Sequence, residues 1–276
     1  MQRIILLVTV ALLMPLPAAA QKAPAGYVVS LDLSGADRTA LARNGKELAP
    51  RLMMPLYDGD IVLLRDPESR VGIETGAGER IDVGGTRPRF EVKGEFPTGG
   101  DASAVMSALA SELGKAEVAQ GGAEPLKLPM AVRGPNFLVK SDRPLWLAWT
   151  GGTAPFKVIV EVDGRARVHG AIRERSFAFD VPETAGKRFE IVIKDAANGL
   201  SRNTFRFRDR LPEPPAALSA AARGRTSAKL ALAAWLTTLH EGDWSVEAAQ
   251  ILHNGTADDH ASAALLDRIT AGWKLN

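Results

Sequence analysis

Short apolar segments separated by turn dipeptides constrain this 276-residue chain more than any other feature of its sequence. Many of these segments alternate apolar with polar residues, as half-buried strands do. The turns between them are marked by Asn44-Gly45, Asp58-Gly59, Asp163-Gly164 and Asn198-Gly199. Asn-Gly and Asp-Gly pairs favour tight turns between strands. The pattern therefore predicts a mainly β protein.

The predicted strands fall into two groups. The first runs from about Tyr27 to Phe96 and predicts an all-β meander with short connections. The second begins near Met130, and its segments recur at the regular spacing that favours a β-sandwich. The seven segments of the second group are NFLVKS, LWLAWTGG, FKVIVEVDG, RARVHG, SFAFDV, KRFEIVIKDAANG and NTFRFRD.

Helical spacing appears between the two groups and again near the carboxyl end. Ala102–Leu113 is predicted as one short amphipathic connector helix, capped by Asp101 or Ser103. Its predicted inward side chains are Val105, Met106, Leu109 and Leu113. After a proline- and alanine-rich linker, helices are predicted over Thr226–Leu239, over SVEAAQILH with Asp243 or Ser245 as its cap, and over Asp259–Trp273. Helices this short must pack together or against the sandwich.

The first twenty residues have the pattern of a secretory signal peptide. Arg3 precedes the apolar run Ile4–Met14, and Ala18-Ala19-Ala20 offers a cleavage site before Gln21. A spanning helix needs about 20 apolar residues, so a retained anchor is the less favoured alternative. The chain contains no cysteine, which excludes disulfides and a lipid-modified amino-terminal cysteine. These features predict export to the bacterial periplasm, with membrane contact only through the export signal.

Overall charge and apolar content narrow the function classes. The chain has 34 basic and 32 acidic residues, and its net charge of +2 is too small for a general nucleic-acid binder. The apolar fraction of 46% is ample for a buried core, which argues against disorder throughout the chain.

No catalytic, cofactor or metal site is predicted. The sequence has no G-x-S-x-G elbow and no P-loop, and GAGERI lacks the third glycine of a dinucleotide loop. Its histidines match no standard metal-binding spacing, and they are His169, His240, His253 and His260. Asp58 and Asp60 flank a glycine, so we interpret them as turn residues rather than paired catalytic carboxylates.

The stretch LMMPLYDGDIVLLRDPESRVGIETGAGERIDVGGTRPRFEV resembles the FecR-like periplasmic domain, over about Gly26–Glu95. The resemblance implies a repetitive β-structure that serves regulation or interaction instead of catalysis. In iron-transport regulators of this family, a cytoplasmic arm that contacts a sigma factor precedes a membrane span. This chain opens with a signal peptide instead, so the resemblance implies an envelope interaction module without sigma-factor regulation.

A second resemblance covers about Asn136–Arg210, where LWLAWTGGTAPFKVIVEVDG is similar to the central strands of immunoglobulin-like or fibronectin-like sandwiches. Trp149 stands where such domains bury a tryptophan. Phe189 stands where many carry a tyrosine, so the hydrogen bond of that tyrosine hydroxyl is not expected here. The resemblance implies a two-sheet β-sandwich.

The predicted binding residues are cationic or aromatic. FRFRDR alternates phenylalanines with Arg206, Arg208 and Arg210, while GRARVHG contributes Arg165 and Arg167. Such a face is suited to an anionic envelope polymer or an acidic protein, although charged strand faces also serve only to prevent edge pairing. Trp146 is a candidate for stacking on a sugar, with packing as the alternative.

We therefore predict a mainly β protein with a carboxyl-terminal α segment, acting without catalysis as a periplasmic scaffold, sensor or adaptor. Its expected partner is an envelope protein, with peptidoglycan or another anionic polymer possible and nucleic acid excluded. The alternatives are a module that binds cell-wall glycan and a carboxylate-dependent hydrolase. The predicted divisions are a signal peptide at 1–20, a FecR-like β module at 21–97, a helical connector at 98–130, an immunoglobulin-like β-sandwich at 131–211 and a helical tail at 212–276.

Overall fold

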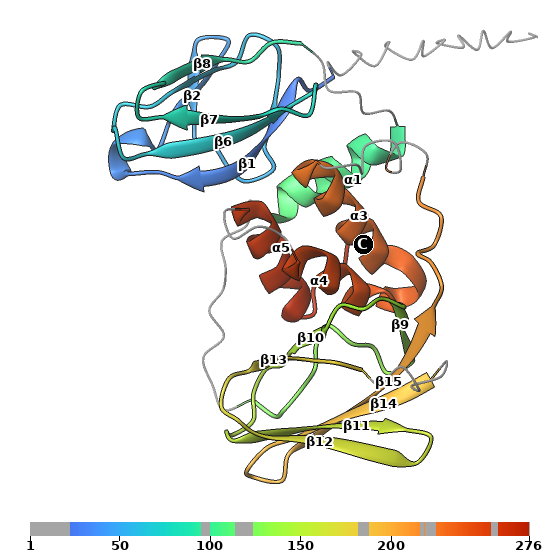
Figure 1. Ribbon diagram of the computed structural model, residues 1–276. Coiled ribbons are helices and arrows are strands. Elements are labelled where there is room, and N and C mark those ends of the chain that lie inside the picture. The colour runs from blue at the N-terminus through green and yellow to red at the C-terminus, as the bar shows by residue number, and fades with distance from the viewer. Residues whose placement is uncertain are drawn as a thin grey trace, which may run out of the picture.

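The computed structural model describes residues 23–94, 100–113, 124–181, 188–215, 218, 225–254 and 259–275, with the side chains of α1 described from residue 105 on. Predictions about the signal peptide, the cap of the first helix and the segment boundaries near residue 97 lie outside these residues. Within them the chain is mainly β with carboxyl-terminal helices, which confirms the predicted fold class (Figure 1).

Eight short strands form the first β module. They are β1 (Gly26–Asp32), β2 (Leu41–Arg43), β3 (Lys46–Leu48), β4 (Pro55–Leu56), β5 (Ile61–Leu63), β6 (Arg70–Thr75), β7 (Arg80–Gly84) and β8 (Arg89–Glu91), with a 3₁₀ turn η1 (Gly35–Asp37) after β1. They form two four-stranded sheets, in the orders β4-β1-β6-β7 and β3-β2-β5-β8. The predicted meander is therefore wrong in its connections, because only β2–β3 and β6–β7 pair in sequence. Alternation between sheets lets both bury apolar faces around one core, which includes Val28, Leu41, Val62 and Ile73.

Asp58 and Asp60 have the structural role that was predicted for them. Gly59 has a positive φ of 91°, and the Asp60 N–H donates to the Tyr57 carbonyl 2.9 Å away, which closes the turn. The Asp60 carboxylate is buried and forms an ion pair with Arg43 at 2.7 Å. The Asp58 carboxylate accepts the Gly94 N–H instead. These contacts tie the two carboxylates to different parts of the module.

All seven segments predicted for the second β module are strands. They are β9 (Pro135–Val139), β10 (Leu145–Ala148), β11 (Phe156–Val162), β12 (Arg165–Ile172), β13 (Ser176–Phe179), β14 (Arg188–Lys194) and β15 (Leu200–Arg208). One sheet has the order β12-β11-β14-β15-β9, and β10 pairs with β13 in a second sheet. Trp149 is 3% exposed and therefore a core residue as predicted, and Phe189 is buried as well at 2% exposed.

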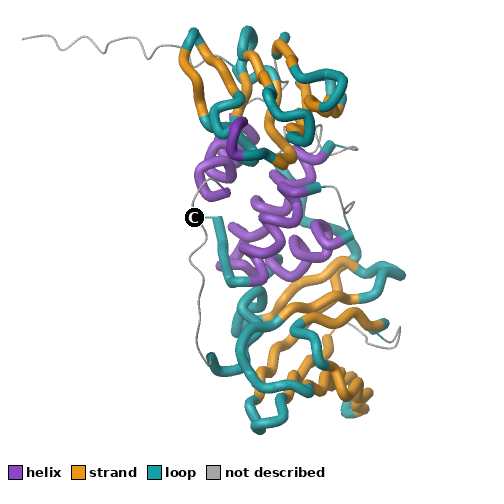
Figure 2. Tube along the Cα trace, turned by 90° about the vertical axis from the view of Figure 1, so that its left-hand side faces the viewer, coloured by secondary structure: helices purple, strands orange, loops and turns teal. Residues whose placement is uncertain are grey.

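The helices lie between the two β modules, as Figures 1 and 2 show. They are α1 (Gly100–Leu113), α3 (Thr226–Thr238), η2 (Leu239–Gly242), α4 (Ser245–His253) and α5 (His260–Thr270). Helix α3 is central and packs against α1, α4 and α5. Its small alanines permit this close approach, and Leu230, Ala233 and Leu236 are fully buried. Met106 and Leu109 of α1 are buried against the same cluster, so the predicted connector helix is part of this helical layer.

The helix caps differ from the prediction in one place. Asp259 caps α5, because its carboxylate accepts the Ser262 N–H at 3.0 Å. Helix α4 has Trp244 as its N-cap residue, without a side-chain hydrogen bond, so neither Asp243 nor Ser245 caps it. Ser245 already occupies the first helical position, and its hydroxyl is buried with no hydrogen-bond partner among the described residues.

Helix α4 closes one side of the β-sandwich by bonding to the edges of both sheets. On β9, the Phe137 N–H donates to the Asp243 carbonyl just before α4, and the Val139 N–H donates to the Glu247 carboxylate. On β10, the Gln250 amide accepts the Trp146 N–H at 2.9 Å and donates to the Trp146 carbonyl at 2.6 Å. Unpaired sheet edges must be covered or blunted, and here a helix covers two of them.

An ion pair also strengthens the junction between α4 and the sandwich. Arg143 donates to the Glu247 carboxylate, whose side chain is only 2% exposed. Burial raises the pKa of Glu247 above its ordinary value, although the Arg143 charge opposes that rise.

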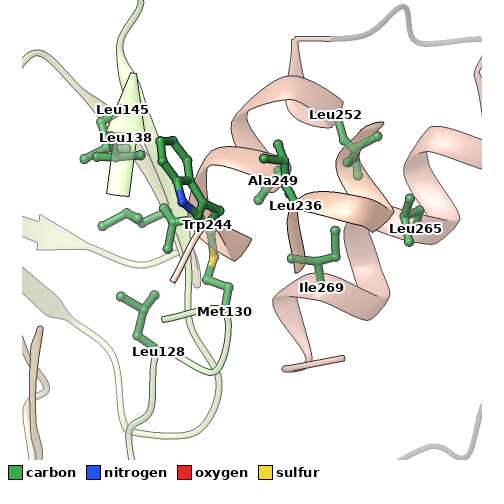
Figure 3. Close-up of a cluster of buried hydrophobic side chains, with 14 of the residues drawn as sticks. Leu128, Met130, Leu138, Leu145, Leu236, Trp244, Ala249, Leu252, Leu265 and Ile269 are labelled. Carbon is green, nitrogen blue, oxygen red and sulfur yellow. The ribbon is translucent and has the colours of Figure 1, made fainter. Parts of the chain in front are cut away.

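Apolar side chains also pack across the junction between α4 and the sandwich. Figure 3 shows Trp244 between Leu138 and Leu145 of the sandwich and the helical residues Leu236 and Ala249.

The first β module joins the helices through its β1–β6 sheet. Tyr27 and Val29 of β1 belong to the same buried cluster as the helices and the sandwich. The Glu74 carboxylate of β6 is buried and accepts hydrogen bonds from the backbone N–H and hydroxyl of Ser227, in the first turn of α3. A carboxylate is stabilised at a helix amino terminus, where backbone N–H groups lack partners. The His260 ring contacts the Leu31 carbonyl at 3.1 Å.

The double hydrogen bond from Gln250 predicts a measurable loss of stability. The substitution Gln250→Met keeps the length of the side chain but leaves the partly buried N–H and carbonyl of Trp146 without these hydrogen bonds. We expect the free energy of unfolding to fall by about 1–3 kcal/mol in urea titrations. Glu161→Gln, at an exposed ion pair, is the control and should change it by less than about 0.5 kcal/mol. An unchanged urea midpoint for Gln250→Met would contradict this role for the amide.

Candidate functional site

The five predicted arginines do not share one face of the five-stranded sheet. Arg165 and Arg167 are register partners of Val162 and Val160, which face the core, so both lie on the inner side of the edge strand β12. Arg206 alternates with the buried Phe205 and therefore points to the outer side. The prediction of a single arginine face is wrong. Side chains alternate between the two sides of a sheet, and the arginines of β12 fall on the opposite side from those of β15.

Four arginines do gather on the outer side, around β14, β15 and the end of β15. Arg206 lies directly opposite Arg188 in the β14–β15 pair. Arg208 follows two residues later on the same side, and its guanidinium lies 4.3 Å from the centre of the Phe137 ring. We call Arg188, Arg206, Arg208 and Arg210 the arginine surface. Like charges directly opposite each other destabilise a sheet, so Arg188 and Arg206 repel in the free protein.

The arginine surface lacks the compensation that a neighbouring arginine has. Arg202 donates to the Glu190 carboxylate at 2.6 Å and to the Glu161 carboxylate at 3.2 Å, which neutralises it. Arg188 has only a longer contact of 3.6 Å with Glu190. Between described residues, no ion pair engages Arg206, Arg208 or Arg210. Their guanidinium donors are therefore turned to solvent.

A cleft of about 770 Å³ adjoins the arginine surface. It lies between the end of β15, the following proline-rich segment and the η2–α4 junction. Its lining residues are Phe137, Arg208, Arg210, Leu211, Pro212, Glu213, Pro214, His240 and Trp244. Two arginine side chains thus lie beside aromatic and proline side chains, and Glu213 is the single acidic residue among the described residues of the lining.

His240 is placed in the cleft by an unusual backbone. His240, Glu241 and Gly242 have consecutive positive φ angles of 45°, 62° and 97°. The left-handed conformation costs a non-glycine residue about 1–2 kcal/mol, so other contacts must hold it. Lys274 donates to the Glu241 carbonyl.

Asp243 borders the same bend. Burial raises the pKa of its carboxyl above the ordinary value, and the nearby Glu241 charge adds to the rise. Its backbone carbonyl is the acceptor for Phe137, so this residue joins the bend to β9. The hydrogen bond from Phe137 to Asp243, directly after η2, therefore helps to fix the position of His240 relative to β9.

Trp146 does not offer a free ring face on the side of α4. Its ring stacks on the His253 ring at a centroid distance of 4.3 Å and an interplanar angle of 11°. Partial burial lowers the pKa of His253 below its ordinary value. The predicted half-exposure of Trp146 agrees with the structure, but this stacked position favours packing over a role as a sugar platform.

The hydrolase alternative requires two available acidic groups in one hollow. A hollow of about 550 Å³ is lined by three acidic residues, Glu161, Asp163 and Glu190, together with Arg188. Two of them, Glu161 and Glu190, are bound to Arg202. The acidic groups whose pKa values are raised, Asp243 and Glu247, lie elsewhere. Within the described ranges, no group of three metal-ligating side chains is found.

Sequence reasoning found Arg206, Arg208 and Arg210 but missed their neighbours. Arg188 is adjacent only through the β14–β15 register, and Phe137 only through the parallel pairing of β9 with β15. KRFEIVIK and FRFR each alternate charged with apolar residues, and this shared pattern is the sequence signal that could have indicated Arg188. Trp244 also lines the cleft and is 5% exposed.

Comparisons with known proteins do not assign this chain to a family. No protein-family model matches the sequence, and no curated protein matches it. Among solved structures, one similar chain is described as a Ca²⁺-stabilised adhesin that helps an Antarctic bacterium reach out and bind ice. The similarity covers 55% of this chain and 32% of the adhesin chain, with 11% identity and a TM-score of 0.18. In the described part of this chain, no helix is both long and apolar enough to cross a membrane.

The stacking of His253 on Trp146 predicts a shifted titration. We expect the His253 ring to titrate with a midpoint below 6.5, because a partly buried imidazolium loses hydration. The substitution Trp146→Ala uncovers the ring and should move the midpoint back toward 6.5. NMR titration of the imidazole protons measures both values. A midpoint that is the same in both proteins would show that the stacked contact does not exist in solution.

Proposed function

We propose that this protein is a non-catalytic scaffold or adaptor of the bacterial envelope, and that it binds an acidic protein partner through the arginine surface and the adjoining cleft. The carrying observation is the opposition of Arg188 and Arg206 on neighbouring strands. Two guanidiniums side by side are unfavourable alone, and a carboxylate or phosphate between them removes the repulsion.

The shape of the cleft supports a chain-like ligand. Arg208 is held in place by its stacking on Phe137, so its planar donors lose little freedom when they bind an anion. Pro212 and Pro214 are half-buried beside it and add apolar contact. An acidic segment with interspersed apolar residues complements both the arginines and the prolines of this lining. An uncharged sugar polymer offers neither carboxylates for the arginines nor apolar side chains for Pro212 and Pro214.

The strand arrangement supports an immunoglobulin-like reading of the second β module. In that fold the third, sixth and seventh strands form one sheet, and the second and fifth strands lie in the other. Here β11, β14 and β15 are adjacent in one sheet, and β10 pairs with β13 in the other. For the first β module, the FecR-like reading is supported by its short strands. Both readings suit an interaction protein.

Charge reversal on the arginine surface tests the proposal, and it should separate binding from stability. Arg206→Glu removes one charge needed by the partner but forms a favourable pair with Arg188. We therefore expect unfolding stability to stay the same or rise by up to about 1 kcal/mol. Binding of the purified protein to poly-glutamate should weaken about tenfold or more, because a charge-assisted hydrogen bond is lost and a repulsion is added. Fluorescence titration at low salt measures the affinity.

The matched control is Arg51→Glu, which makes the same charge change at an exposed site in the first β module. It should leave the affinity for poly-glutamate nearly unchanged. Cross-linking in intact envelopes then identifies the partner, with protein captured by the wild type and lost with Arg206→Glu. Equal loss in both variants would reduce the effect to net charge, and recovery of cell-wall glycan instead of protein would favour the glycan-binding alternative.

Export is the remaining part of the proposal. We expect protein recovered from the envelope fraction to lack residues 1–20 and to begin at Gln21, as intact-mass measurement would show. Substitution of Ala18 and Ala20 by bulky residues should block cleavage at this site. Recovery of the full-length chain in the cytoplasmic fraction would contradict export.

A further inference from the structure

Strand β12 is a long open edge of the β-sandwich. It is the terminal strand of the five-stranded sheet, and no strand among the described residues pairs with its other side. By contrast, α4 covers the edges of β9 and β10 at the opposite side of the sandwich. The first seven residues of β12 lie at the surface or only partly beneath it, and Val168 is 58% exposed.

The hairpin register fixes which backbone groups of β12 are free. Asp163 and Gly164 form a two-residue turn with φ angles of 47° and 75°, and Val162 pairs with Arg165 beside it. Residues next to such a turn bond to each other, and the bonding alternates along the strand. Arg165 and Arg167 therefore direct their backbone groups toward β11. Ala166 and Val168 direct theirs toward the open edge.

The same register gives the open edge two chemically different sides. On the inner side stand Arg165 and Arg167, which are exposed and form no ion pair between described residues. On the outer side stand Ala166 and Val168. A strand added to this edge would thus meet cations on one side and apolar side chains on the other. The complementary strand alternates acidic with apolar residues.

Pairing with a second copy of the chain is unfavourable. Antiparallel addition of one β12 to another would place the arginines of one copy against the arginines of the other, and like charges opposite each other destabilise a sheet. The arginines thus prevent self-association at the edge while they favour an acidic strand. A partner strand obtains affinity from the backbone of Ala166 and Val168 and selectivity from the flanking side chains.

We propose that β12 is a second binding surface, which accepts an extended segment of a partner protein that alternates acidic with apolar residues and adds to the sheet as an antiparallel strand. This surface is separate from the arginine surface of the proposed function, because it lies at the other end of the sheet order from β9 and β15.

The test uses a soluble peptide of sequence Thr-Glu-Val-Glu-Val-Glu-Thr and the full mature chain. Hydrogen exchange followed by NMR should show slower exchange of the Ala166 and Val168 amides when the peptide binds. A peptide with lysine in place of glutamate should bind at least tenfold more weakly. A glutamate peptide that is N-methylated at alternate residues should also bind at least tenfold more weakly, because it cannot form the backbone ladder.

Two matched variants of Val168 complete the experiment. Val168→Pro removes the outward N–H without breaking a bond to β11, and it should abolish the slowed exchange at Ala166 that the glutamate peptide causes. Val168→Thr keeps that N–H and should bind within about threefold of the wild type. Arg206→Glu should keep the slowed exchange of the Ala166 and Val168 amides when the glutamate peptide is added, even where it weakens binding at the arginine surface, and this readout separates β12 from the proposed function. Peptide binding without slowed exchange at Ala166 and Val168, or equal binding of the glutamate and lysine peptides, would overturn the proposal.

Discussion

The docking of α4 on the open edges of β9 and β10 is the interaction on which the rest of the structure depends. A two-sheet sandwich of five and two strands leaves edge N–H and carbonyl groups that water or another chain must satisfy. Glu247 and Gln250 satisfy three of them from one helix. A helix of nine residues is not stable alone, so the helix and the sandwich stabilise each other.

The same contact determines where the candidate binding cleft lies. Phe137 donates to the Asp243 carbonyl at the start of α4, which brings the left-handed bend at His240 beside β15. Trp244 then packs against Phe137, whose ring also supports the Arg208 guanidinium. The cleft therefore combines residues that lie far apart in the chain, such as Phe137 and Trp244. The contact between α4 and the sandwich determines its geometry.

Arginine has two structural settings in this sandwich. Arg143 and Arg202 are bound to carboxylates and hold elements together. Arg206 and Arg208 have no such partner between described residues and remain available. The distinction is one of neighbours. Arg143 meets Glu247 of α4 and Arg202 reaches Glu190 on the neighbouring strand, whereas Arg206 has Arg188 directly opposite.

Local patterns were sufficient for the elements themselves. Alternation and turn dipeptides identified all seven strands of the second β module, and helical spacing identified α1, α3, α4 and α5. They failed for the connections of the first β module, because two- and three-residue strands leave several pairings open. They also failed for the cap of α4, where contact with β9 fixes the helix start instead of a local side chain.

The sequence by itself determined the class of each segment, since hydrophobic periodicity and turn chemistry act over a few residues. It also determined that Arg206 and Arg208 stand near one another, since alternate residues of a strand share a side. Only the tertiary structure decided that Arg165 and Arg167 lie apart from them, that Arg188 joins them, and that β12 stays open while β9 and β10 are covered. Strand register and helix docking depend on contacts between distant residues, and no local pattern specifies these.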